Sequence, residues 1–220
     1  RGTATVGTPV AGTGSAISFG TMTIGGGYTV VATNPTTGCI RSMSGSATIT
    51  VNPLPTAYTV TGGGSYCAGG AGVHIFLSGS EIGVNYQLKN GSTSVGAPMA
   101  GTGFALYFGI RTAAGTYTIV ATDNITLCTG TMAGSAVITI DPLPTVYNVT
   151  GGGNYCAGGT GVHIGLSNSA VGISYQLLIG GSPVGAPMTG TGAALDFGLF
   201  TGTGLSLSLC SSRFALAASR

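Results

Sequence analysis

The stretch TGGGSYCAGGAGVHI at residues 61–75 returns as TGGGNYCAGGTGVHI at residues 150–164, 89 residues later and with two substitutions. The same offset relates GAPMAGTG at 96–103 to GAPMTGTG at 185–192. An exact period of this kind, kept without insertions, predicts tandem copies of one structural unit. The glycines, cysteines and histidines of the opening stretch are therefore first of all parts of a repeated building block.

The repeat divides the chain into three parts. They are the back part of a first repeat (residues 1–52), a complete repeat (53–141) and a truncated third repeat (142–220). The joints between them carry the sequences NPLP and DPLP. Proline holds the chain extended and donates no backbone hydrogen bond, so we expect these joints to separate the repeats.

The two ends of the chain depart from a complete repeat. The chain begins in mid-repeat with neither a methionine nor a signal peptide, so we expect it to be a piece of a longer protein. After Gly204, LSLSL shifts the apolar phase by one residue relative to the second repeat. Such a shift would turn the leucines outward, and we expect an aberrant tail there.

Apolar residues alternate with polar ones throughout the complete repeat. In VHIFL, Val73, Ile75 and Leu77 share one face, and His74 and Phe76 share the other. The same period of two occurs in NYQLK (85–89), TYTIVAT (116–122) and SAVITI (135–140). About six or seven short strands joined by Gly-rich turns predict an all-β fold, a tandem array of antiparallel Ig-like β-sandwich modules. In such a module Tyr117 would make the corner before the penultimate strand.

Composition excludes some partners. Charged residues make up 5% of the chain, the net charge is +2, and the six basic residues are scattered. We therefore expect no nucleic-acid partner. Mean hydropathy is positive at +0.49, but no run of about 18 apolar residues is uninterrupted, so we expect no membrane span.

The units NPLPT.Y.VTGGG.YCAGG.GV.I.LS.S..GV.YQL and GTYTIVAT....C...M.GSA.ITI resemble the tandem Ig-like repeats of large secreted bacterial cell-surface proteins of the adhesin type. The resemblance covers residues 1–204. It implies an extracellular location at the bacterial cell surface and a structural or adhesive role. The partners it implies are other copies of the chain, neighbouring repeats, surface proteins or surface glycans. It supplies no catalytic residues.

The five cysteines suggest disulfides of a secreted module. With the usual strand order, Cys67 precedes the second strand and Cys128 follows the penultimate strand, which would place both at one end of the sandwich. A Cys67–Cys128 bond would close a loop of about 60 residues and stabilise the fold by roughly 4 kcal/mol. Cys156 would then pair with Cys210. Free buried thiols are the alternative.

Metal and cofactor chemistry find little support. A zinc site built from Cys67, His74, Cys156 and His163 lacks any C-x2-C pair and would draw on two separate repeats. The glycine stretches lead into strands and lack the lysine of a phosphate loop. We expect no cofactor and no metal.

Catalysis is equally poorly supported. No G-x-S-x-G motif occurs, and the only carboxylates are Glu81, Asp123, Asp141 and Asp196. Asp123 lies in a loop and Asp141 at a joint, and neither has an evident histidine partner, so we expect a non-catalytic protein. A hydrolase with an unrecognised site is the second alternative.

The expected function is that of a stalk, adhesin or fibre subunit. Its incomplete end repeats would be completed by strands of another copy, giving head-to-tail assembly by strand complementation. The first alternative is a glycan-binding β-sandwich module. His74, Phe76 and Tyr107 are the predicted exposed contact residues in either case.

Overall fold

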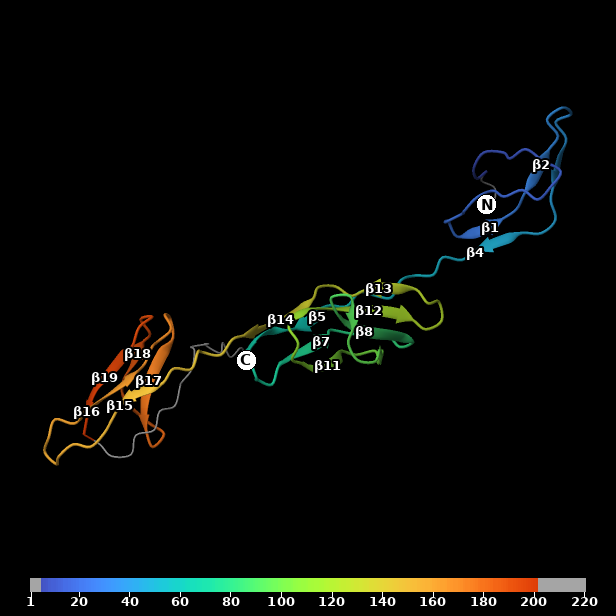
Figure 1. Ribbon diagram of the computed structural model, residues 1–220. Coiled ribbons are helices and arrows are strands. Elements are labelled where there is room, and N and C mark those ends of the chain that lie inside the picture. The colour runs from blue at the N-terminus through green and yellow to red at the C-terminus, as the bar shows by residue number, and fades with distance from the viewer. Residues whose placement is uncertain (1–4, 202–220) are drawn as a thin grey trace. The chain divides into compact units, whose positions relative to one another are not determined.

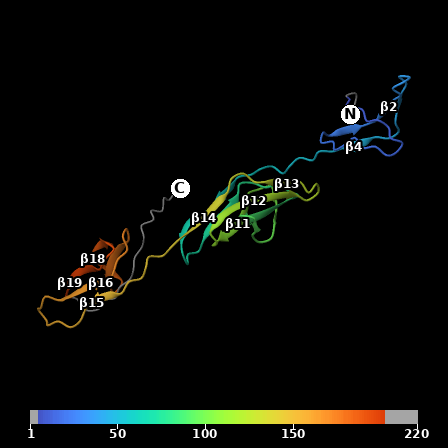
Figure 2. The ribbon, with the colours of Figure 1, turned by 45° about the horizontal axis from the view of Figure 1, so that its top comes forward.

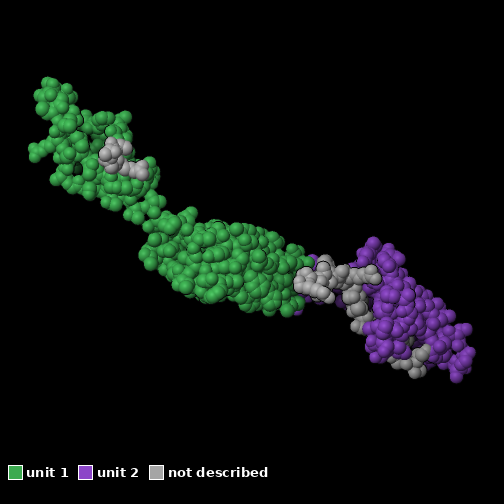
Figure 3. All heavy atoms as spheres, turned by 180° about the vertical axis from the view of Figure 1, so that it is seen from behind, with its two compact units in different colours: residues 1–66, 70–140 green, residues 67–69, 141–220 purple. Residues whose placement is uncertain are grey.

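The computed structural model describes residues 5–201 (Figure 1). These residues form strands and no helix, which confirms the predicted all-β class. Consequently no described segment is a helix able to cross a membrane. The chain divides into two compact units, residues 1–66 with 70–140 and residues 67–69 with 141–220 (Figure 3).

The N-terminal part of the first unit contains four short strands. They are β1 (Gly26–Tyr28), β2 (Val31–Thr33), β3 (Ile40–Ser42) and β4 (Ala47–Ile49). β1 pairs antiparallel with β4, and β2 with β3. Most side chains on these strands are exposed.

The complete repeat, residues 53–141, is called the central region below. Its strands are β5 (Val60–Gly62), β6 (Gly64–Cys67), β7 (Val73–Leu77), β8 (Val84–Asn90), β9 (Thr93–Ser94), β10 (Met99–Ala100), β11 (Leu106–Arg111), β12 (Gly115–Asp123), β13 (Thr129–Thr131) and β14 (Ala136–Asp141). One sheet has the order β10-β8-β12-β14-β6, with β9 on β8 and β13 on β12, and the other has the order β11-β7-β5. Figures 1 and 2 show this region mainly in green. One hydrophobic core draws residues from both sheets, an arrangement compatible with a β-sandwich.

The core follows the predicted alternation. On β7, Ile75 and Leu77 are fully buried, whereas His74 and Phe76 are exposed. The same rule holds on the other core strands, where the buried residues are Tyr86, Leu88, Tyr117, Ile119, Ala121, Ala136 and Ile138. Ile140 shares the inward phase of β14 but is exposed, because it lies near the strand end, beyond the core. Successive side chains of a strand point to opposite faces, so the sequence pattern was sufficient to assign these faces.

Tyr117 makes the predicted corner. Its side chain is buried, and its hydroxyl donates a hydrogen bond of 2.9 Å to the carbonyl oxygen of Ala113, four residues earlier. Tyr28 makes the corresponding bond of 2.7 Å to Ile24. Each bond ties the loop before a strand to the strand itself.

We expect Tyr117→Phe to lower the free energy of unfolding of the central region by about 1 kcal/mol, because one hydrogen bond to a partly buried hydroxyl is lost while the ring still fills the core. Urea unfolding measures the change. Tyr107→Phe is a control of the same chemistry on an exposed surface and should cost less. Equal costs for the two variants would contradict a stabilising role for the corner.

The second unit contains five described strands. They are β15 (Val149–Gly151), β16 (Val162–Leu166), β17 (Ser174–Ile179), β18 (Ser182–Thr189) and β19 (Leu195–Phe200). One sheet has the order β15-β16-β19, and β17 pairs with β18. Leu166, Tyr175 and Leu195 form its core cluster. The predicted tail after Gly204 and Cys210 lie outside the described residues.

Candidate functional site

The three predicted contact residues lie together on the outward face of the β11-β7-β5 sheet. His74 and Phe76 are two residues apart on β7 and therefore share a face. Tyr107 on β11 is the direct cross-strand neighbour of Phe76. We call His74, Phe76 and Tyr107 the aromatic cluster.

The rings of the aromatic cluster contact one another. Ring centroids are 6.0 Å apart for His74 and Phe76, 5.5 Å for His74 and Tyr107, and 5.0 Å for Phe76 and Tyr107. The interplanar angles are 13°, 30° and 29°, so the three ring planes have nearly one orientation. His74 Nδ1 lies 2.8 Å from the Tyr107 hydroxyl oxygen. Phe76 and Tyr107 nevertheless remain 40% and 46% exposed, so the cluster presents an open aromatic surface.

The residues paired with His74 on β11 and with Phe76 on β5 are uncharged. The β11 register shifts between Tyr107 and Ile110, and this irregularity places the exposed Ile110 opposite His74. On the other side, Thr61 of β5 is opposite Phe76. Sequence reasoning missed Ile110, because alternation alone cannot place a residue beyond such a shift.

The corresponding positions of the second unit have different chemistry. His163, 89 residues after His74, lies with its Nδ1 2.7 Å from Oδ2 of Asp196, which is 89 residues after Tyr107. Gly165 stands in place of Phe76, so the ring is missing. The backbone N–H of Gly198, 2.8 Å away, is the main cause that lowers the pKa of Asp196, and the hydrogen bond with His163 adds to it. Asp196 thus has a histidine partner 33 residues earlier in the chain.

The predicted Cys67–Cys128 disulfide is wrong, because both residues are free thiols. Tyr66, next to Cys67, donates its hydroxyl hydrogen bond to the Thr112 carbonyl, before the start of β12. The backbone carbonyl oxygen of Cys128 instead accepts a hydrogen bond from the N–H of Asp123, at the end of β12. At the usual rise per residue of a β-strand, the start and the end of β12 are on the order of 30 Å apart. A disulfide needs the two Cα atoms within about 7 Å of each other.

The other cysteines lie apart from any site. Cys39 and Cys156 are exposed free thiols. The predicted Cys156–Cys210 pair has one member outside the described residues, and it stays a prediction. Among residues 5–201, no three His, Cys, Asp or Glu side chains are grouped so that they could hold a metal ion.

Asp123 caps a turn at the end of β12. Its Oδ1 accepts hydrogen bonds from the backbone N–H groups of Thr126 (2.7 Å) and Ile125 (2.9 Å), and from the Thr126 hydroxyl. These bonds, that of the Thr126 N–H first, lower the pKa of the carboxyl group. Asn34 is placed alike in the N-terminal part, where its Oδ1 accepts from Thr36 and Thr37.

Asp123→Asn should remove a pH dependence while keeping the turn, as Asn34 does. The folded carboxyl has a lower pKa than the unfolded one, so its stabilising effect is complete above the unfolded pKa of about 3.9 and is lost as the pH falls through the folded pKa. Urea unfolding at pH 7 and at several values below pH 4 measures the difference. The wild-type chain should lose more stability on acidification than the variant; parallel pH profiles would contradict this role.

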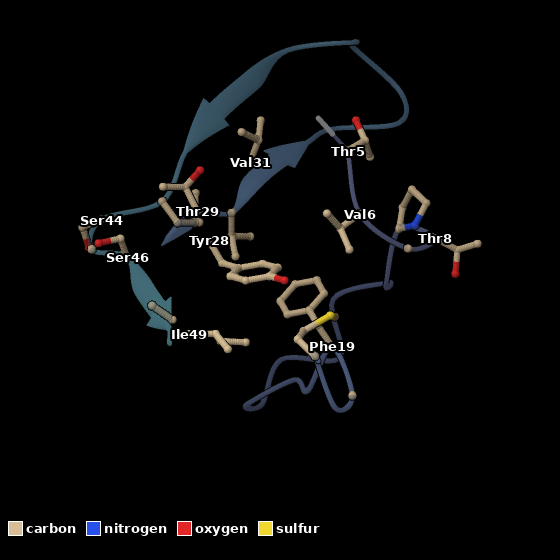
Figure 4. Close-up of a pocket in the computed structure, with 18 residues that line it drawn as sticks. Thr5, Val6, Thr8, Phe19, Tyr28, Thr29, Val31, Ser44, Ser46 and Ile49 are labelled. Carbon is tan, nitrogen blue, oxygen red and sulfur yellow. The ribbon is translucent and has the colours of Figure 1, made fainter. Parts of the chain in front are cut away.

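An open hollow of about 810 Å³ occupies the N-terminal part. Figure 4 shows Phe19, Tyr28 and Val6 pointing into it. Phe19 is 44% exposed, whereas Phe108, its counterpart 89 residues later, is 4% exposed in the core of the central region. The same contrast holds for Val30 and Met43 against the buried Ile119 and Met132. The hollow is thus an uncovered version of the core face that the central region buries.

No protein-family model, curated protein or solved structure matches this chain.

Proposed function

We propose that this chain is a non-catalytic structural or adhesive array of Ig-like β-sandwich modules with an 89-residue repeat, located outside the cell at a bacterial surface. The array builds fibres or stalks by strand complementation between incomplete modules. The observation that carries the module assignment is the matched hydrogen bonding at the repeat distance, around Ser80 and Ser169.

Equivalent local structure at the repeat distance supports the module assignment. Ser80 is buried, donates to the Phe104 carbonyl (2.6 Å) and accepts from the Thr102 N–H (2.9 Å). Ser169, 89 residues later, is also buried and makes bonds of the same lengths to Ala193 and Thr191. A buried hydroxyl is stable only where an acceptor and a donor are in position to hydrogen-bond with it. The same pair of bonds around Ser80 and Ser169 therefore favours one common module structure.

The uncovered face has a defined complement. In the central region, the counterparts of the hollow residues are covered by the core residues of β5, β7 and β8. Residues 149–179 carry the corresponding strands β15, β16 and β17, whose core residues Ile164, Leu166, Tyr175 and Leu177 are already buried, so they would have to be uncovered before another copy could use them. The described residues therefore include the back strands of one module, within residues 5–49, and the front strands of another, within residues 149–179.

Joining these halves between copies gives head-to-tail assembly. The two contact surfaces differ, so the interface is heterologous and can continue from copy to copy. Each junction would convert an exposed apolar face into a core, which is the main favourable term in such an association. Strand addition would also satisfy unpaired edges.

Light scattering of the 220-residue chain at several concentrations tests the assembly. We expect species larger than one chain, and we expect Phe19→Asp or deletion of residues 1–52 to abolish them, because each removes the apolar face. Ile40→Asp is the matched control: Ile40 is exposed on β3 and does not line the hollow, so assembly should persist. A monomeric wild-type chain, or equal loss with both aspartate variants, would reject the proposal.

A further inference from the structure

We infer that the aromatic cluster binds a single pyranose ring of a neutral glycan. The inference concerns the central region alone. It does not depend on assembly between chains, because the cluster lies on the outward face of the β11-β7-β5 sheet and not in the core face that complementation would cover.

The size of the cluster fits a small ligand. Phe76 and Tyr107 expose 40% and 46% of their surfaces, and for aromatic residues of about 200 Å² this amounts to roughly 200 Å² in total. A stable protein partner buries about 800 Å² on each side. The open aromatic area therefore matches a single sugar ring much better than a protein interface.

The geometry of the rings favours a sugar over a cation. An ammonium group is held best by ring faces that surround it, whereas the three planes of the cluster lie within 30° of one another. At centroid distances of 5.0–6.0 Å the rings are packed against one another, so a flat ligand would lie against an exposed outer ring face of the cluster. The C–H groups of a pyranose carry a slight positive charge and are attracted to the electron-rich aromatic surface.

Polar groups beside the rings can form hydrogen bonds with the sugar hydroxyls. The bond between His74 Nδ1 and the Tyr107 hydroxyl leaves His74 Nε2 without a partner among the hydrogen bonds of residues 5–201. Nε2 donates in one tautomer and accepts in the other, and a sugar hydroxyl does both, so either tautomer is matched. Thr61 adds a second hydroxyl on the neighbouring strand, and the flanking Ile110 brings no charge.

The second unit provides an internal comparison. It keeps the histidine as His163 but has Gly165 and Asp196 at the other two positions. Without two of the three rings, it lacks the stacking surface. The site that we infer is thus specific to the central region, and Tyr107→Asp introduces the partner that the second unit already uses for its histidine.

The experiment is saturation-transfer NMR on the full chain with chitohexaose, cellohexaose and mannohexaose as probes. We expect transfer to ring C–H protons of at least one probe and a dissociation constant of roughly 1 mM, typical of a small open site. Tyr107→Asp and Phe76→Ala should each weaken binding at least tenfold. The matched control is Phe104→Ala, which removes an exposed phenylalanine outside the cluster and should leave binding unchanged.

Thermal unfolding of each variant shows whether the fold is kept. If Phe76→Ala is unfolded, Tyr107→Asp alone tests the binding. The inference is overturned if none of the three probes binds at about 10 mM, or if Phe104→Ala weakens binding as much as the cluster variants. Binding that survives both cluster variants would overturn it as well, because the sugar would then lie elsewhere. A failure of assembly in light scattering would leave these results unaffected, so the two proposals can fail separately.

Discussion

Replacing Gly62 by alanine is expected to lower the free energy of unfolding of the central region by about 3 kcal/mol or more. Gly62 ends β5 with φ at +98°, in a region that side chains rarely adopt, which alone costs about 1 kcal/mol. In addition, a Cβ atom there would overlap the backbone carbonyl oxygen of His74. That carbonyl belongs to β7, whose Ile75 and Leu77 are fixed in the core, so the backbone has little room to yield.

Gly69→Ala is the matched control. Gly69 also has a positive φ, of +82°, but no heavy atom lies within 4 Å of a Cβ built there. We therefore expect only the conformational cost of about 1 kcal/mol. Urea unfolding of both variants separates the two effects; an equal loss of stability would show that the close approach of β5 and β7 is not tight.

Leu77→Ala is expected to lower the free energy of unfolding by about 3 kcal/mol. Leu77 is fully buried and stands between Val60 of β5 and Leu106 of β11, which are its cross-strand neighbours and also belong to the core. Truncation removes buried methyl groups and leaves a cavity that the two paired neighbours cannot close.

The adjacent residue supplies the comparison for this prediction. Phe76→Ala removes a larger side chain, but that side chain is partly exposed on the other face, and we expect a cost below about 1 kcal/mol. Chemical denaturation of the two variants measures the difference. A larger cost for Phe76→Ala would contradict the assignment of faces on β7.

The disulfide prediction shows where reasoning from sequence failed. It assumed that the ends of two strands meet because a familiar strand order would bring them together. In the structure, β6 pairs with β14, and Ala68, just after β6, donates a hydrogen bond to Asp141 at the end of β14. The hydrogen bond from Tyr66 to Thr112 places Cys67 beside the start of β12. Strand pairing of this kind depends on contacts between residues distant in sequence, which no local pattern encodes.

The aromatic cluster was predicted in part. Alternation placed His74 and Phe76 on the outward face, and the structure agrees. Tyr107 lies opposite Phe76 and forms a hydrogen bond with His74 because of the register of β11 on β7. His74 and Tyr107 are 33 residues apart in the chain, so no local pattern shows this contact. The recurrence of the same spacing between His163 and Asp196 was a usable signal in the sequence, but its meaning is visible only once the strands are paired.

By itself, the sequence determined that the fold is all-β, which residues of β7, β8, β12 and most of β14 point inward, and that Tyr117 closes a corner. These properties are local: the side chains of an extended backbone alternate with a period of two, and the corner bond spans four residues. Only the tertiary structure decided which cysteines are far apart, which outward rings touch and which apolar face stays open. These depend on strand order and register, which are set by the packing of the whole sheet, because a shift of one residue moves every side chain to the opposite face.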